Sequence, residues 1–151
     1  MSHKELEAGL YMITSPCLHG GSFIGRDLNE DRSLGPKKVV VLPVGVEAPK
    51  WIVEPMGKGR YKLKVGGAIT CEMKQELYAM LIGLEGEEWM IKYRDYHDAY
   101  TIEKANEKAG WLVPDMKPFT QIAVRPLQSQ PSAPPKFPDS ELWKFIRIDR
   151  D

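Results

Sequence analysis

The residues best suited to recognition chemistry lie in one polar stretch, GRDLNEDRSLGPKK, which spans residues 25–38. It places Arg26 and Arg32 among several acidic residues, and it separates two apolar runs. A guanidinium is planar and can form two parallel hydrogen bonds with a carboxylate, so an arginine on an exposed loop is suited to an acidic pocket of a partner. The stretch is too polar for a buried strand and too long for a tight turn, which indicates a loop that could carry the function.

Catalytic chemistry has little support in the sequence. The histidines are scattered, and none lies in a metal-binding or nucleophile motif: His3, His19 and His97. The chain contains neither a G-x-S-x-G nucleophile elbow nor a phosphate-binding P-loop. Asp95 and Asp98 flank His97, but no serine or cysteine can be paired with it from the sequence. We therefore expect no enzyme activity, no metal and no cofactor.

The composition is that of a soluble globular protein without a preference for polyanions. Of the 151 residues, 42% are hydrophobic and 28% are charged, unlike a disordered chain. Lysine plus arginine and aspartate plus glutamate each number 21, and this balance argues against nucleic acid or an anionic membrane as a partner. The length fits a single domain over residues 1–151.

Two features bear on the compartment. No apolar run approaches the length of a membrane-spanning helix, and the segment MSHKELEAGL lacks the apolar core of a secretory signal. We expect a cytoplasmic protein, or one exported without a signal peptide. Cys17 and Cys71 match no zinc motif. They allow one disulfide, but two free thiols suit a reducing compartment better.

Short runs of β-branched and aromatic residues, separated by Gly, Pro, Asn and Asp, predict an all-β protein. The strand candidates number twelve: LYMI (10–13), SFIG (22–25), VVVL (39–42), WIVE (51–54), YKLKV (61–65), AIT (68–70), LYAMLIGL (77–84), WMIK (89–92), YTIE (100–103), WLV (111–113), QIAV (121–124) and WKFIRI (143–148).

Tyrosines and tryptophans recur along these candidates in a regular order. Tyr11, Tyr61 and Tyr100 each open a Y-x-[IL] element, and an aromatic-apolar element opens at each of Trp51, Trp89 and Trp143. Trp51 precedes Tyr61 by 10 residues, and Trp89 precedes Tyr100 by 11. Three four-stranded units that open on Tyr and close on Trp predict a β-trefoil, which is a six-stranded barrel capped by three hairpins. An open sandwich or another small barrel is the alternative.

A proline-rich segment, RPLQSQPSAPPKFPDSEL at residues 125–142, interrupts the last unit. It contains five prolines, and proline cannot pair in the middle of a sheet. We expect a long, stiff surface loop whose main role is connection.

Segments spread over nearly the whole chain match a known pattern: GLYMITSP, FIGRDLNEDRSLGPKKVVVLP, EEWMIK, YTIEK, GWLVP and QIAVRPL. The most specific of them is EDRSL-x-PK followed by a valine-rich strand. Together they resemble the mushroom serine protease inhibitors of β-trefoil fold, the cospin and cnispin group. The resemblance implies a monomeric, reversible inhibitor of trypsin-like serine proteases. Its loop mimics a substrate, and its role is fungal defence or the regulation of proteolysis.

The resemblance also implies a reactive loop. In cospin-like members the primary specificity residue is an arginine between the second and third strands, and Arg26 is the matching residue. Its neighbours would form the flanking reactive loop: Gly25, Asp27, Leu28 and Asn29. The acidic Asp27 directly after Arg26 is unfavourable for many trypsin-like enzymes.

Other residues of the pattern have different expected roles. We interpret Asp31 and Arg32 as loop-bracing residues that form a charge pair, because EDRSL is the shared part of the motif. The carboxylates of Asp27, Glu30 and Asp31 could accept backbone N–H groups of the loop. In cnispin-like members a lysine between the last two strands is the specificity residue, and its nearest counterpart, Lys136, is the alternative here.

Two other functions stay open. Ricin-type lectins carry Q-x-W in the fourth strand of each unit, where this chain has APKW, EEW and ELW. The glutamine is missing each time, so a carbohydrate- or protein-binding module is only the second hypothesis. An inhibitor of another protease class is the third, because a fold alone does not determine a function.

Overall fold

The computed structural model describes residues 5–18, 21–82, 86–105, 108–129 and 135–148. Within them lie twelve β-strands and one short 3-10 helix: β1 (Gly9–Thr14), β2 (Ile24–Arg26), β3 (Lys37–Val41), β4 (Trp51–Gly57), β5 (Arg60–Val65), β6 (Ala68–Met73), β7 (Glu76–Met80), β8 (Trp89–Arg94), β9 (Ala99–Lys104), β10 (Ala109–Leu112), β11 (Ala123–Pro126), η1 (Asp139–Glu141) and β12 (Lys144–Arg147). The all-β prediction is confirmed. The strand expected over residues 77–84 ends earlier, at Met80, and the last two of its expected residues lie outside the described ranges.

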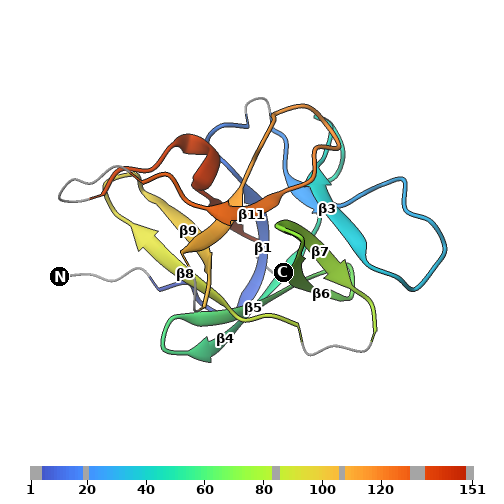
Figure 1. The fold of residues 1–151 in the computed structure, drawn as a ribbon, viewed down its shortest axis with the longest axis horizontal. Coiled ribbons are helices and arrows are strands. Elements are labelled where there is room, and N and C mark those ends of the chain that lie inside the picture. The colour runs from blue at the N-terminus through green and yellow to red at the C-terminus, as the bar shows by residue number, and fades with distance from the viewer. Residues whose placement is uncertain (1–4, 19–20, 83–85, 106–107, 130–134, 149–151) are drawn as a thin grey trace.

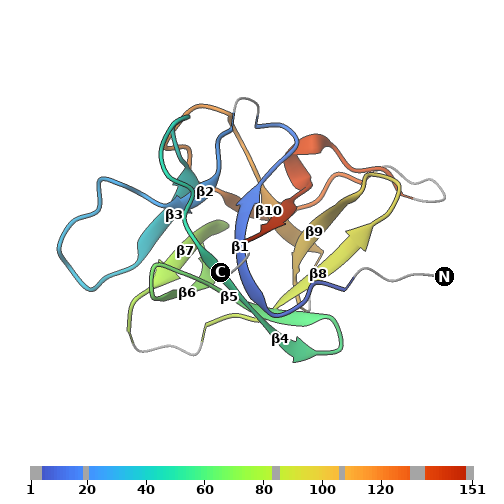
Figure 2. The ribbon, with the colours of Figure 1, turned by 180° about the vertical axis from the view of Figure 1, so that it is seen from behind.

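Six strands form the barrel (Figures 1 and 2), and they pair in the order β12–β1–β4–β5–β8–β9. The barrel closes where Tyr100 of β9 pairs with Trp143, directly before β12, through two backbone hydrogen bonds of 2.8 Å. Among the described strands of the barrel this closure leaves no open edge, and an open edge would be a site for aggregation.

Three hairpins form the cap of the barrel: β2–β3, β6–β7 and β10–β11. They pair with one another in a ring, because β3 pairs with β7, β7 pairs with β11, and Val40 of β3 bridges Gln121 just before β11. The chain thus forms three units of four strands, β1–β4, β5–β8 and β9–β12. The predicted β-trefoil is the observed fold.

The aromatic repeat marks equivalent positions in the three units. The opening tyrosine of each unit pairs with its closing tryptophan: Tyr11 with Trp51, Tyr61 with Trp89, and Tyr100 with Trp143. The indoles of these three closing tryptophans each donate a hydrogen bond of 3.0–3.1 Å to the second strand of their own unit, to Ile24 O, Thr70 Oγ1 and Trp111 O respectively. A buried indole N–H is costly without an acceptor, so these bonds let the large rings sit in the core.

Trp111 lies at the centre of that core. Its ring centroid is 5.8 Å from that of Trp51, 5.3 Å from that of Trp89 and 6.0 Å from that of Trp143. All four side chains are fully buried. Because the four rings come from all three units, the cluster joins the units in one close-packed core.

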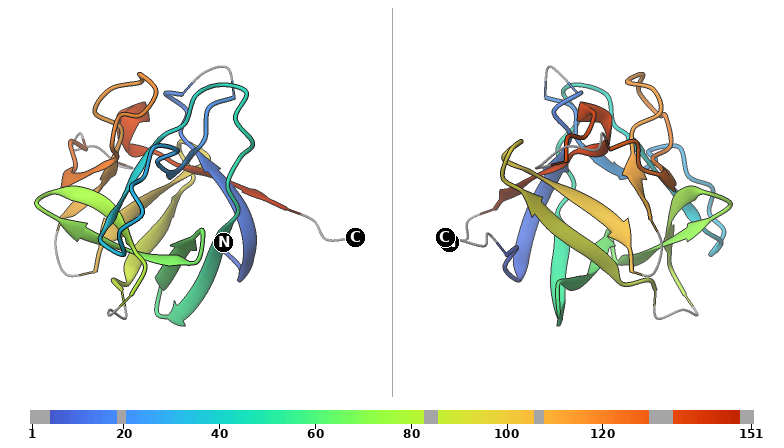
Figure 3. Two further views of the ribbon diagram at one scale, coloured as in Figure 1. Left: turned by 90° about the vertical axis from the view of Figure 1, so that its right-hand side faces the viewer. Right: turned by 60° about the vertical axis from the view of Figure 1, so that its left-hand side comes forward.

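Three further features concern the cysteines, membrane-spanning helices and the β3–β4 loop. Cys17 and Cys71 are free, as expected, and burial raises the pKa of both thiols. No helix among the described residues is long and apolar enough to cross a membrane. Figure 3 shows the molecule from two further sides, with the β3–β4 loop at residues 42–50 on the same end as η1.

Candidate functional site

The polar stretch singled out in the sequence forms the connection between β2 and β3. Arg26 is the last residue of β2, Lys37 is the first residue of β3, and residues 27–36 lie between them. This loop projects away from the barrel and cap (Figures 1 and 2). The structure therefore places the predicted reactive stretch where a partner can reach it.

The pairing of β2 with β3 sets the direction of the Arg26 backbone. Asp27 N donates to Lys38 O at 3.0 Å, and Leu42 N donates to Phe23 O at 2.9 Å. In an antiparallel ladder, hydrogen-bonded and non-hydrogen-bonded pairs alternate, so Arg26 and Val39 form a non-hydrogen-bonded pair. The N–H and C=O of Arg26 consequently point away from β3. Among the described residues β2 pairs only with β3, so β3 leaves these groups of Arg26 without a ladder partner. They lie on the side of β2 where Ile24 O accepts the Trp51 indole.

The Arg26 side chain is held by two partners instead of extending into solvent as the sequence suggested. Its Nε and Nη2 donate to Glu30 Oε2 and Oε1 at 2.8 and 2.6 Å, and its Nη1 donates to Gly66 O at 2.5 Å. The side chains of Arg26 and Glu30 are 23% and 18% exposed. The hydrogen bonds to Glu30 raise the pKa of Arg26 against the opposing effect of burial. The guanidinium thus bridges its own loop and the β5–β6 turn.

The β5–β6 turn accepts the guanidinium because it carries no side chain there. Gly66 and Gly67 have φ values of +57° and +76° and join Val65 to its partner Ala68. A Cβ on Gly66 would lie 2.9 Å from Nη1 and 3.0 Å from Cδ of Arg26. A side chain at this position would therefore displace the arginine.

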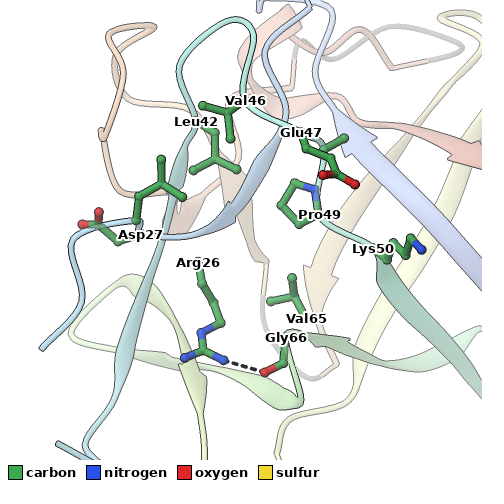
Figure 4. Close-up of a pocket in the computed structure, with 11 residues that line it drawn as sticks. Arg26, Asp27, Leu42, Val46, Glu47, Pro49, Lys50, Val65 and Gly66 are labelled. Carbon is green, nitrogen blue, oxygen red and sulfur yellow. Dashed lines mark hydrogen bonds between the residues drawn. The ribbon is translucent and has the colours of Figure 1, made fainter. Parts of the chain in front are cut away.

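A groove of about 630 Å³ lies beside Arg26 (Figure 4), and it is bordered by β2, the β3–β4 loop and the β5–β6 turn. Leu42, Val46 and Pro49 form its apolar side, and Lys50 lies at its rim. Gly25 is needed for this packing, because a Cβ there would lie 2.3 Å from Pro49 Cγ. Gly25 was predicted as a flanking reactive residue, and in the structure it is a buried packing position.

The first part of the loop is braced by a local turn. Asp27 Oδ1 accepts the Asn29 N–H at 2.9 Å, so the Asp27 carboxylate braces the backbone as expected. Leu28 and Asn29 are exposed at the tip of this turn. They are the residues of the predicted flanking loop that a partner can touch most directly.

The second part of the loop is braced by Asp31, whose partner is Lys37 and not the expected Arg32. Lys37 Nζ donates to Asp31 Oδ1 at 2.8 Å and to Asp31 O at 3.1 Å, and the Lys37 side chain is only 4% exposed. Ser33 donates to the same carboxylate through its N–H and its hydroxyl. The hydrogen bond from Lys37, with those from Ser33, lowers the pKa of Asp31 to about 2. Arg32 is exposed and makes no ion pair within the described residues.

Lys136, the alternative specificity residue, lies on another side of the molecule. It is exposed, and its Nζ lies 5.4 Å from the ring centroid of Tyr96 in the β8–β9 turn. The next residue, Phe137, is buried and donates its N–H to His97 Nε2 at 3.1 Å. In Figures 1 and 2 the β8–β9 turn and the β2–β3 loop lie on opposite sides, so the structure does not bring Lys136 and Arg26 together.

Three residues of the site received the wrong role or none from the sequence. Glu30 was expected to accept backbone N–H groups and instead pairs with Arg26, and neither the buried Lys37 nor the turn residue Gly66 was singled out. The dipeptide Gly66–Gly67 between two strand candidates is a hairpin signal that could have located the turn. No pattern could have placed that turn beside Arg26. Within the described ranges, no cluster of three or more His, Cys, Asp or Glu side chains is arranged to hold a metal ion.

Comparisons with known proteins find protease inhibitors that match nearly the whole chain. The sequence model of the peptidase inhibitor I66 family matches residues 4–147. A serine protease inhibitor from Lentinula edodes is 37% identical over 149 residues, which span 96% of this chain and 100% of that protein. A proteinase inhibitor from Coprinopsis cinerea has a solved structure with a TM-score of 0.85 at 35% identity, and the match covers 95% of this chain and 99% of that one.

A more distant likeness concerns the fold alone. A lectin from Polyporus squamosus superposes with a TM-score of 0.68 at 14% identity, over 94% of this chain and 50% of that chain. At this identity the likeness supports the trefoil architecture and says nothing about sugar binding by this chain.

Proposed function

Because the chain belongs to the peptidase inhibitor I66 family, and its relatives include a serine protease inhibitor and a proteinase inhibitor, we propose that it blocks trypsin-like serine proteases through the β2–β3 loop. Arg26 is the primary specificity residue of this proposal. The protein binds reversibly as a monomer, in the manner of a substrate, and serves defence or the regulation of proteolysis.

The observation that carries the proposal is the backbone direction of Arg26. Its N–H and C=O point away from β3, and Asp27 N is fixed to Lys38 O at 3.0 Å on the side of β3. A protease holds a substrate by hydrogen bonds to its backbone and places the carbonyl of the primary residue in the oxyanion hole. The ladder leaves these groups of Arg26 unpaired by β3 for such contacts, while the bond at Asp27 keeps the backbone in place.

The side chain provides matching chemistry. Trypsin-like enzymes have a buried aspartate at the bottom of the primary pocket, and a guanidinium can form a bidentate, desolvated pair with it. Rigidity separates an inhibitor from a substrate, because a preorganised loop loses less entropy on binding. Asp27 and Asp31 provide this rigidity by fixing the loop backbone at Asn29 and Ser33.

The test is a titration of trypsin with a small chromogenic substrate. We expect inhibition by the wild-type protein at or below micromolar concentration. Arg26→Ala should weaken it by several kcal/mol, roughly a thousandfold, as expected for an interface hot spot. Arg26→Lys should retain inhibition, because the lysine ammonium also fits a pocket with an aspartate.

Arg32→Ala is the matched control, because Arg32 is an exposed arginine of the same loop. Its inhibition constant should stay within a few fold of the wild-type value. An absence of inhibition by the wild-type protein would reject the trypsin assignment. If the Arg26→Ala variant inhibits fully and the Lys136→Ala variant does not inhibit, the reactive site lies in the β11–β12 loop instead.

A carbohydrate- or protein-binding module remains the alternative function, with support from the fold alone. Saturable sugar binding on a glycan array that persists in Arg26→Ala would favour it over inhibition.

A further inference from the structure

In the free protein the guanidinium of Arg26 is already hydrogen-bonded to groups of its own chain. Glu30 accepts two of its N–H groups at 2.8 and 2.6 Å, and Gly66 O accepts a third. The side chain lies along the protein toward the β5–β6 turn (Figure 4). A primary specificity side chain must instead extend into the protease pocket, where Glu30 cannot follow. Free and bound states therefore need different positions of the same side chain.

We propose that Glu30 is a specificity-determining residue that competes with the protease for Arg26. It holds the guanidinium in a docked position, and a protease must draw the side chain out before the primary pocket is filled. This inference rests on the proposed function, because it takes Arg26 as the primary residue.

The competition sets the apparent affinity. When only a fraction of the molecules has Arg26 released, the apparent dissociation constant rises by the reciprocal of that fraction. A bidentate pair of a guanidinium and a carboxylate is among the stronger hydrogen-bonded contacts in proteins, and its partial exposure weakens it. With 23% and 18% of the two side chains exposed, we expect the pair to reduce the association rate about tenfold.

The chemistry of Glu30 also biases the choice of the primary residue. Arginine forms two parallel bonds with one carboxylate, whereas a lysine ammonium is a single point of charge. Docking therefore opposes Arg26 more strongly than it would oppose a lysine at the same position. The effect of Glu30 should depend on the identity of residue 26.

The experiment compares the wild-type protein with Glu30→Gln, which keeps the size of the side chain and removes its charge. We expect the association rate constant with trypsin to rise about tenfold while the dissociation rate changes little, because the barrier lies in the free inhibitor. In the Arg26→Lys background the same substitution should change the association rate by no more than about threefold.

Glu47→Gln is the matched control for charge. Glu47 lines the same groove and is exposed, and no contact between it and Arg26 occurs in the described residues. If Glu47→Gln accelerates association as much as Glu30→Gln does, the effect is general electrostatics and the proposal is wrong. The proposal also fails if Glu30→Gln leaves the rate unchanged or weakens inhibition.

A second measurement needs no protease. The exchange of the Arg26 Nε–H with solvent, followed by nitrogen-edited NMR, should be slow in the wild-type protein and fast in Glu30→Gln. Fast exchange in the wild-type protein would overturn the docked state directly. Slow exchange without inhibition by either protein would reject both the competition and the proposed function. Wild-type inhibition that Glu30→Gln does not improve rejects the competition alone.

Discussion

The contact between Arg26 and the β5–β6 turn predicts unequal effects for two adjacent and otherwise similar substitutions, Gly66→Ala and Gly67→Ala. Both glycines have positive φ, +57° and +76°. A Cβ on Gly66 would lie 2.9 Å from Arg26 Nη1, whereas a Cβ on Gly67 would meet nothing within 4 Å. The guanidinium is the end of a flexible side chain, so we expect it to move away and lose its hydrogen bond to Gly66 O.

The magnitudes follow from two contributions. An alanine in the left-handed region costs about 1 kcal/mol at either position. At Gly66 the lost charge-assisted hydrogen bond adds about 1 kcal/mol, the lower end of its usual range because the arginine is partly exposed. Gly67→Ala should thus lower the unfolding free energy by about 1 kcal/mol, and Gly66→Ala by about 2 kcal/mol. For a chain of this size these losses correspond to falls in Tm of about 3 and 6 °C.

Urea denaturation and calorimetry of the two variants would test the prediction. The backbone contribution alone would make the two losses equal, or larger at Gly67, whose φ is further from the left-handed minimum. Equal losses would therefore refute the role of the Arg26 contact. The difference should also disappear in an Arg26→Ala background, because the contact that causes it is then absent. In the protease assay Gly66→Ala should accelerate association, as we expect for Glu30→Gln.

Two further predictions concern other carboxylates. Glu141 is buried, its Oε1 has no hydrogen-bond partner within the described residues, and burial raises its pKa. The folded state thus keeps this proton to higher pH than the unfolded state, so stability should fall as the pH rises from the ordinary value of 4.5 through the raised pKa. Glu141→Gln should remove this loss, which urea denaturation at pH 4 and pH 8 would detect. Asp27→Ser removes a negative charge directly after Arg26, keeps an oxygen that can accept the Asn29 N–H, and should lower the inhibition constant for trypsin about tenfold. An unchanged constant would show that Asp27 does not oppose the protease.

The fold was predictable because its signal is local and repeated. The pairs Tyr11–Trp51 and Tyr61–Trp89 occupy equivalent places in the barrel, so one physical requirement, a large ring with a satisfied polar group, recurs along the chain. The end of β7 at Met80 was not predictable in the same way. Leu81 and Ile82 continue its apolar run, and composition alone does not show where the partner strand ends.

The position of the site in the loop between β2 and β3 could be predicted from the sequence, but the contacts that its side chains make could not. Glu30 lies four residues after Arg26, a spacing that has meaning on a helix but none in a loop whose path is unknown. Gly66 is 40 residues from Arg26, so only the folded barrel brings them together. A buried lysine is rare enough that the hydrophobic pattern gave no reason to choose Lys37 over Arg32 as the partner of Asp31.

The ion pairs Arg26–Glu30 and Asp31–Lys37 hold the loop independently of each other. This matters because the proposed mechanism releases Arg26 and still needs a rigid loop. If Arg26 alone held the loop in place, its release would leave a flexible loop, and flexible loops are cleaved as substrates. Asp31, however, is fixed by Lys37, which is anchored in β3, and neither residue contacts Arg26 within the described structure. Drawing Arg26 away from Glu30 therefore leaves the second half of the loop braced. The loop can exchange one partner of its arginine for another and keep the rigidity that inhibition requires.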